Sequence, residues 1–352
     1  MHKNNFEPKC LATGIGSLPY KDAKEAFSKA RECFPSIPFW PQLPKRSYLE
    51  SMGAQFIENF ACLKVDEQKK AAVYDIKENK EEQFTKFYER ILKVDFEYFK
   101  ISRSCAESLY VLLDELEQKK LENVEFIKGQ VTGPFTLAAA IKGEAGKPTL
   151  FDPMMFDMIV NGLAMKGLWQ AEQFKKFNKK PIIFFDEPYL SCLGSAYTPI
   201  SSAEVTSRLL ELFNPLKQAG VLVGIHCCGN TEWPVLLGSM ADIVSFDAWE
   251  YFDKLAIYPG EIKTFIENGG VLAFGIVPAH NIPQDLSVSM LVEKIKSQFD
   301  ILVQKGIDKK IILKKCLLTP SCGLGTVPEQ DADRVLEVLK NTSLALRKEY
   351  FK

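Results

Sequence analysis

Two chemically functional residues, His226 and Cys228, lie at the end of an apolar segment that begins at Val221. The segment has the length of a strand, and side chains on a strand alternate between its two faces. His226 and Cys228 therefore point the same way, while Cys227 points the opposite way. A neutral imidazole beside a thiolate makes half of a tetrahedral zinc site. The alternative is a core cysteine next to a hydrogen-bonded histidine, because free cysteine is commonly buried.

The ends of two later apolar runs offer the missing ligands. Cys322 precedes Gly323 at the end of one run, and Asp247 ends the other. Glu250 is the alternative carboxylate, but we prefer Asp247 because the strand itself carries it to the rim. Two thiolates, an imidazole and a carboxylate form a ligand set that zinc selects. The predicted metal ligands are His226, Cys228, Asp247 and Cys322.

Further polar residues lie at the ends of other apolar runs. A carboxylate at Asp186 is costly there without an ammonium or metal partner, and a functional role and a helix-cap role are equally open. Glu50 lies in a short helical segment and, by itself, is interpreted as a surface charge favoured by the helix dipole. His280, taken alone, is an ordinary loop histidine. The glycines on either side of Ile15 permit close approach to a ligand, but alone they predict a tight turn.

Eight short apolar segments, most of them ending in a polar or glycine-rich turn, have the pattern of buried parallel strands. They are Cys10–Ser17, Ile37–Gln42, Val124–Val131, Pro181–Asp186, Val221–Cys228, Asp242–Asp247, Val271–Val277 and Lys315–Cys322. Amphipathic or charged stretches of helical length lie between most of them. These include Lys21–Cys33, Asp152–Asn178, Ser201–Gln218, Leu286–Lys305 and Pro328–Lys348.

This alternation predicts an α/β protein with the (β/α)8 TIM-barrel fold, whose active site lies at the C-terminal strand ends. A doubly wound open sheet is the main competitor, but no glycine-rich dinucleotide-binding fingerprint follows any strand. Residues 59–118 are predicted to form an insertion after the second strand, with a hairpin over Phe60–Lys70 and one or two helices over Glu81–Gln118. No repeat or linker divides the chain, so residues 1–352 are predicted to form a single domain.

Composition excludes several classes of protein. The 352 residues include 44 Lys and Arg and 45 Asp and Glu, giving a net charge of −1 without a basic stripe, so no nucleic-acid partner is expected. No apolar run is long enough to span a bilayer, so no membrane association is expected. The first residues lack the apolar core of a signal peptide. Nine cysteines in such a chain indicate a reducing cytoplasm, where thiols are free or bind metals.

These motifs together resemble the C-terminal catalytic barrel of cobalamin-independent methionine synthase over nearly the full length of the chain. Val131-Thr-Gly-Pro134 is similar to that family's Thr-Gly-Pro turn, and Asp186-Glu187-Pro188 to its Asp-Glu-Pro motif. His226-x-Cys228 and Cys322-Gly-Leu are similar to its zinc ligands. The family's acidic ligand is a glutamate, and an ungapped comparison puts Asp247 at that position.

The resemblance implies roles for further residues in binding homocysteine. Ile15 and Ser17 lie in what looks like the family's homocysteine-binding turn, and Glu50 falls near the acid that meets the amino acid. Asp186 corresponds to the aspartate that holds the homocysteine amine. His280 sits where the family has a histidine proposed as the proton donor to the leaving folate.

The methyl donor is implied by the layout of the chain. The full-length synthase has a second, N-terminal barrel that helps to hold the folate, whereas this chain has room for one barrel. It is similar to the short "core" methionine synthases, which take methyl from a methylated corrinoid protein. The implied cofactors are Zn²⁺ and a methylcorrinoid that this chain does not bind tightly. Since no Asp-x-His-x-x-Gly corrinoid motif is present, a corrinoid iron–sulfur or other corrinoid protein is the expected partner.

Three other functions stay open. The sequence from His226 to Thr231 resembles that of enzymes that move methyl groups from corrinoids to coenzyme M. Coenzyme M is an acceptor without an ammonium group. A relative of uroporphyrinogen decarboxylase would share the barrel but needs no zinc, and its arginine-rich entry loop is not found near Ser17. A non-catalytic zinc-binding or corrinoid-chaperone protein would hold zinc without turnover.

Overall fold

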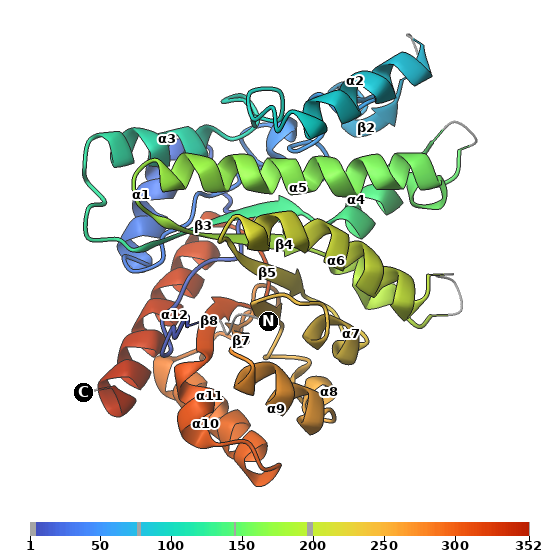
Figure 1. The fold of residues 1–352 in the computed structure, drawn as a ribbon. Helices are drawn as coiled ribbons and strands as arrows, with labels where there is room; N and C mark the ends of the chain where they lie inside the picture. Colours follow the sequence, from blue (N-terminus) through green and yellow to red (C-terminus); the bar gives the residue numbers. More distant parts are fainter. Residues whose placement is uncertain (1–4, 76–78, 144–145, 196–199, 352) are drawn as a thin grey trace.

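A curled sheet of six parallel strands forms the centre of the computed structural model, which describes residues 5–75, 79–143, 146–195 and 200–351. The strands follow one another around the sheet in chain order (Figure 1). Their bounds are β3 Phe126–Thr132, β4 Lys180–Asp186, β5 Leu222–Cys227, β6 Ile243–Phe246, β7 Val271–Val277 and β8 Cys316–Pro320. All six lie where the sequence predicts them.

The first two predicted strands close the sheet into a barrel, although they pair irregularly. Ala12 bridges to Leu318 on β8, and Phe39 bridges to Lys128 on β3. Ser17 and Gln42 join the two segments to each other. Pro38 and Pro41 interrupt the second segment, and proline has no N–H to donate to a ladder. The predicted (β/α)8 architecture is therefore confirmed, with six regular strands and two irregular ones.

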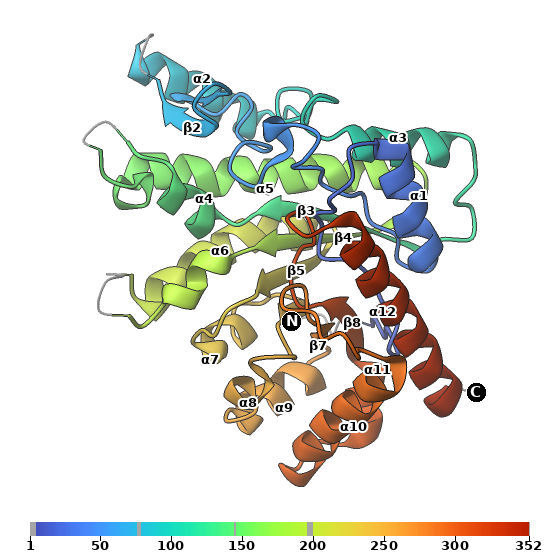
Figure 2. The same ribbon diagram turned by 180° about the vertical axis from the view of Figure 1, so that it is seen from behind.

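Helices cover the outside of the barrel (Figures 1 and 2). Those that match the predicted helical stretches to within a few residues are α1 Ala23–Cys33, α5 Pro153–Lys175, α6 Ser202–Gln218, α10 Val288–Gln304 and α12 Glu329–Tyr350. The shorter ones are α4 Pro134–Ala140, α7 Trp233–Leu237, α8 Phe252–Leu255, α9 Pro259–Glu267 and α11 Lys309–Lys314, with 3-10 turns η1 Tyr48–Glu50, η2 Thr149–Phe151 and η3 Pro188–Cys192. Across the described ranges, no helix combines the length and apolar character that a bilayer crossing requires.

The insertion contains the hairpin β1 Leu63–Asp66 and β2 Ala71–Tyr74, followed by α2 Lys80–Leu92 and α3 Glu107–Glu117. Its strands start and end later than the predicted hairpin, because Phe60 packs on the barrel helix α5, with its ring against Gly162. Helix α2 lies against α5, and α3 packs against α1 (Figure 1). Two helices rather than one fill the second half of the insertion.

Alternation along the strands separates two cores. One set of buried side chains faces the helices, and it includes Cys227 and Cys316. The other set faces the interior of the barrel and fills its lower part with Phe6, Ile37, Ile182, Phe184, Ile243, Val271, Ala273 and Leu317. Above this apolar plug, towards the C-terminal strand ends, the inward-facing residues become polar.

Gly224 is required by the interior packing. A Cβ atom at this position would lie 2.3 Å from the Phe184 ring on the neighbouring strand. We expect Gly224→Ala to lower the free energy of unfolding by about 1–3 kcal/mol, because the ring has no free space to move into. Chemical denaturation followed by circular dichroism measures the change.

Gly260 is the matched control, since it is exposed on α9 and a Cβ there meets nothing within 4 Å. Gly260→Ala should leave stability unchanged or raise it by up to about 1 kcal/mol through helix propensity. Equal effects of the two substitutions would contradict the packing explanation.

Candidate metal centre

Three potential ligands from two strand ends converge at the C-terminal mouth of the barrel. His226 lies on β5, Cys228 directly follows that strand, and Cys322 follows β8. One ligand atom from each residue lies within 4.8 Å of the other two. The predicted same-face arrangement of His226 and Cys228 is thus present, and Cys227 lies in the outer core.

Ser245 fixes the orientation of the His226 ring. The two residues are register partners on β5 and β6, and His226 Nδ1 lies 3.0 Å from Ser245 Oγ. His226 Nε2 is buried and has no hydrogen-bond partner among the described residues. An imidazole held through one nitrogen, with the other left for a ligand, is the usual arrangement of a metal-binding histidine.

The two thiols share one negative charge. A hydrogen bond from Cys322, together with the nearby His226, lowers the pKa of Cys228 to about 4 against the effect of burial. The same hydrogen bond and burial raise the pKa of Cys322. A divalent cation would remove this competition, because it stabilises both thiolates at once. The unpaired His226 nitrogen and the sulfur pair together fit a zinc ion.

Asp247 lies at the end of β6 near this group but makes other contacts. Its Oδ1 accepts hydrogen bonds from the backbone N–H groups of Trp249 and Glu250, both at 2.9 Å. Burial raises its pKa to about 6, while these two N–H groups oppose the shift. No carboxylate completes the group of three in the described part of the chain. Asp247 as fourth ligand therefore stays a prediction, and it is better placed than Glu250, which is exposed.

The two acids that end β4 separate to opposite faces. Glu187 faces outward and caps α4, accepting hydrogen bonds from the backbone N–H groups of Phe135 and Thr136 at 2.9 Å. Gly133 makes room for it, since a Cβ there would lie 2.1 Å from Glu187. The helix-cap role that the sequence left open for Asp186 is thus performed on α4 by its neighbour.

Asp186 faces the barrel interior beside the metal ligands. It is the register partner of His226, and its side chain is buried. Its Oδ1 atom has no hydrogen-bond partner in the described ranges. Burial raises its pKa to about 6, whereas His226 and Lys128 favour the charged form. A buried carboxylate oxygen with nothing bound to it is suited to a cationic ligand.

The turn that contains Ile15 and Ser17 lies against the loop of Cys322. Ser17 Oγ accepts a hydrogen bond from Gly325 N–H at 3.1 Å, and the Ser17 carbonyl accepts one from Leu324 N–H at 2.8 Å. The Ile15 carbonyl accepts a hydrogen bond from the Lys128 ammonium. The first and last strands are therefore joined at the mouth.

Glu50 is not the surface charge that its local sequence suggests. It is 1% exposed, its Oε2 accepts a hydrogen bond from Leu43 N–H at 3.0 Å, and its Oε1 lies 2.9 Å from Arg46 Nε. Burial raises its pKa to about 7, and Arg46 opposes the shift. The chain between Leu43 and Glu50 folds back on itself, which no local pattern predicts.

His280 lies in the loop that follows β7 and is exposed. The loop is at the same end of the barrel as the three ligands, because it follows the C-terminal end of a parallel strand. Its role stays a prediction.

Sequence reasoning missed two residues of this site, Lys128 and Ser245. Lys128 is a lysine within a predicted buried strand, and that mismatch was a usable signal because lysine is almost never fully buried without partners. Ser245 carries no comparable signal, since a serine in a strand is common. Its contact with His226 depends on the register of β5 and β6.

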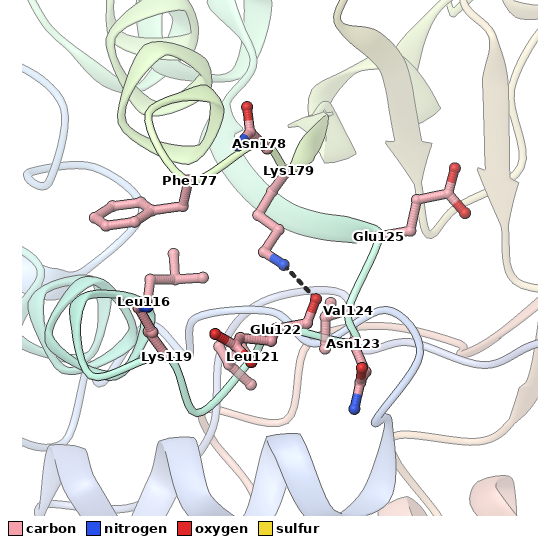
Figure 3. Close-up of a pocket in the computed structure, with 10 residues that line it drawn as sticks. All are labelled: Leu116, Lys119, Leu121, Glu122, Asn123, Val124, Glu125, Phe177, Asn178 and Lys179. Atoms are coloured by element: carbon pink, nitrogen blue, oxygen red, sulfur yellow. Dashed lines mark hydrogen bonds between the residues drawn. The ribbon is translucent and has the colours of Figure 1, made fainter.

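A separate hollow lies at the other end of the barrel, where β3 and β4 begin (Figure 3). Its lining residues surround a hydrogen bond from Lys179 Nζ to the Glu122 carbonyl at 3.0 Å. Leu116, Val124 and Phe177 contribute apolar side chains. Because it is at the end opposite to the metal ligands, we assign it no part in their chemistry.

Comparisons with known proteins identify the fold. No protein-family model and no curated protein matches the sequence. Among solved structures, the chain is similar to a B12-independent methionine synthase from Shewanella sp. W3-18-1 in complex with selenomethionine, at 14% identity and a TM-score of 0.57, over 97% of this chain and 98% of that one. It is also similar to a putative vitamin-B12-independent methionine synthase from Listeria monocytogenes, at 14% identity and a TM-score of 0.54, over 94% and 86% of the two chains. The chain shares the barrel fold of these proteins.

The site predicts that the purified protein binds about one zinc ion per chain. Cys228→Ser and Cys322→Ser should each lose most of the zinc, because each removes a thiolate from the group of three. Cys227→Ser is the matched control and should keep the zinc, since Cys227 faces the outer core. Metal analysis after dialysis against a weak chelator measures the content. Retention of zinc by both ligand variants would contradict the site.

Ser245→Ala tests whether the contact between Ser245 and His226 contributes to metal binding. We expect zinc affinity to fall about 10- to 100-fold, since the ring loses the contact that orients it. Competition with a chromophoric chelator measures the affinity. An unchanged affinity would show that the Ser245 contact does not matter for metal binding.

Proposed function

We propose that this protein is a zinc-dependent methyltransferase that transfers a methyl group to the thiol of homocysteine and so forms methionine. The observation that carries the proposal is the placement of two kinds of free atom at one barrel mouth. His226 Nε2 and the two thiols are suited to a metal ion, and Asp186 Oδ1 is suited to an ammonium group. Homocysteine has a thiol and an ammonium to match both.

The zinc would be held by His226, Cys228 and Cys322, with Asp247 as the fourth ligand in the proposal. When bound, zinc supplies a Lewis acid that lowers the pKa of a thiol, so that a thiolate is present at neutral pH. Ser245 contacts Nδ1 of His226 and so leaves Nε2 available for the metal.

The amino-acid end of homocysteine would bind around Asp186. Its free carboxylate oxygen would pair with the substrate ammonium, and the turn at Ile15 and Ser17 would contact the rest of the amino-acid group. Glu50 is fully buried and paired with Arg46, so in this proposal it shapes the pocket from behind the Leu43 backbone. Holding both ends of the substrate fixes the direction of its sulfur.

The substrate sulfur then attacks the methyl carbon, forming the sulfur–carbon bond as the bond to the donor breaks and its electron pair leaves with the donor. We propose a methylated corrinoid carried by a partner protein as the donor. A Co(I) leaving group needs no strong acid, so in this proposal His280 is less critical than it would be with a folate donor. In this proposal, the insertion from residue 59 to 118 is the docking surface for that partner.

A second candidate is a methylcorrinoid:coenzyme M-type thiol methyltransferase, favoured by the run from His226 to Thr231. Coenzyme M has a thiol but no ammonium. Its binding would leave Asp186 Oδ1 without a partner inside the barrel, which is unfavourable for a buried carboxylate. Homocysteine is therefore the better supported acceptor.

The donor is tested with purified zinc-loaded protein, homocysteine, and either methylcobalamin or methyl-folate. We expect methionine with methylcobalamin and none with methyl-folate alone. Mass spectrometry of the product makes the measurement. Turnover with methyl-folate alone would overturn the corrinoid proposal, and zinc without turnover would favour a non-catalytic zinc protein.

Asp186→Asn tests the acceptor. For homocysteine we expect kcat/KM to fall about 10- to 100-fold, because a charge-assisted contact worth about 1.5–3 kcal/mol is lost. Transfer to coenzyme M should change little, since that thiol has no ammonium. If the substitution left homocysteine transfer unaffected, the amine would not bind at Asp186.

A further inference from the structure

Lys128 is a fully buried lysine that projects into the barrel interior from β3. Its exposed fraction is 0%, and its register partner on β4 is the apolar residue Ile182. Phe184, two residues further along β4 on the same face, belongs to the apolar plug. A charged group at this depth is costly without compensation, so its partners reveal what it does.

Two oxygen atoms and two aromatic rings surround the Lys128 ammonium, and the more distant ring is that of Phe39, with its centroid at 5.8 Å. The ammonium donates hydrogen bonds to the Ile15 carbonyl and to Gln130 Oε1, the latter at 3.2 Å. It also lies 4.5 Å from the centroid of the Phe184 ring, close enough for a cation–π contact. Gln130 is two residues nearer the mouth on the same face, so the lysine side chain extends towards the metal ligands.

Both components that would bind the amino-acid end of the substrate are connected to this ammonium. The Ile15 carbonyl, which accepts the hydrogen bond from Lys128, belongs to the turn at the mouth. Asp186 ends β4, four residues beyond Ile182, the register partner of Lys128, so it lies nearer the mouth on the same interior face. Lys128 lowers the pKa of Asp186 against the effect of burial, and burial lowers the pKa of Lys128 itself to about 7. Asp186 Oδ1 nevertheless has no hydrogen-bond partner in the part of the chain that is described. Lys128 therefore lies deeper in the barrel than the carboxylate and does not occupy the oxygen that a ligand needs.

We propose that Lys128 is a positioning residue for the amino-acid subsite, because it anchors the Ile15 turn and compensates the charge of Asp186 from beneath. The inference rests on the proposed function, since it takes homocysteine as the ligand. Lys128 does not touch the sulfur or the methyl group. It should therefore affect recognition of the amino-acid end and not the reactivity of the thiol.

Calorimetric titration of the zinc-loaded protein with two thiols tests this role. L-Homocysteine uses the amino-acid subsite, whereas 2-mercaptoethanol has only its thiol to offer the metal. Lys128→Met should weaken homocysteine binding about 10-fold or more. The affinity for 2-mercaptoethanol should stay within about threefold of wild type, and in turnover KM should rise while kcat changes little. A purely structural role would weaken both thiols equally or neither.

Lys166 provides the matched control. It is also fully buried, and its Nζ donates to the Lys100 carbonyl at 3.0 Å, beneath the insertion and on the outer side of the barrel. Lys166→Met therefore removes a buried ammonium of the same kind without touching the proposed subsite. It should keep the preference for homocysteine over 2-mercaptoethanol.

A double-mutant cycle with Asp186→Asn separates two effects of Lys128 on homocysteine binding. One acts through Asp186, and the other acts through the hydrogen bond to the Ile15 turn. If Lys128 acts partly through Asp186, the double variant should bind homocysteine more tightly than the sum of the two losses predicts. Lys128→Gln is the second variant should Lys128→Met fail to fold, because its amide retains a donor without the charge. Thermal unfolding and zinc content confirm that each variant is folded and loaded.

The outcomes distinguish the two proposals. If wild type itself shows no preference for homocysteine over 2-mercaptoethanol, the proposed function is wrong. If wild type shows that preference and the Lys128 variants retain it, the role of Lys128 is wrong while the proposed function stands. Equal weakening of both thiols by the Lys128 variants would also overturn the positioning role.

Discussion

The register between neighbouring parallel strands is the constraint on which this site depends. Side chains alternate between the helix-facing and interior faces, so only every second residue can reach the mouth of the barrel. Asp186, His226 and Ser245 are successive register partners on β4, β5 and β6, and all three face inward. A slip of one residue on β5 would exchange His226 and Cys228 for Cys227, and the group of three ligands would be lost. The apolar plug beneath them keeps the register, since its members must stay on the same interior face.

Several charged side chains are buried in this structure. Their partners distinguish the residues that stabilise the fold from those available to bind a ligand. Glu187 accepts hydrogen bonds from the backbone at the start of α4, and Glu50 accepts one from Leu43. The second Glu50 oxygen makes no hydrogen bond among the described residues, but it forms an ion pair with Arg46. Lys166 is satisfied by a carbonyl. By contrast, Asp186 Oδ1 and His226 Nε2 are buried atoms without partners in the described ranges, and they lie on adjacent strands. Unsatisfied buried atoms of this kind are rare because they are costly, so two together at a barrel mouth indicate a ligand site.

The sequence predicted the repeating part of the fold well and the irregular parts less well. All six regular strands and five helices fall where hydrophobic patterning places them, because burial against two faces imposes a recognisable apolar run. The first two segments pair only through isolated bridges, and prolines at positions 38 and 41 explain the irregularity of the second. The hairpin of the insertion lies further along the chain than predicted, since Phe60 packs against Gly162 on a distant helix. The local sequence predicts an exposed Glu50, whereas contacts outside its own turn bury the residue.

The sequence alone determined that His226 and Cys228 share a face, that Cys227 does not, and that further candidate ligands end other strands. These conclusions need only the two-residue period of a strand and the common direction of parallel strands. Only the tertiary structure decided which candidates meet. It joined Cys322 to the pair, left Asp247 bonded to its own following turn, and placed Ser245 and Lys128 beside residues far away in the chain. The physical reason is that distances across a barrel are set by register and curvature, which are collective properties of all its strands and are written in no single segment.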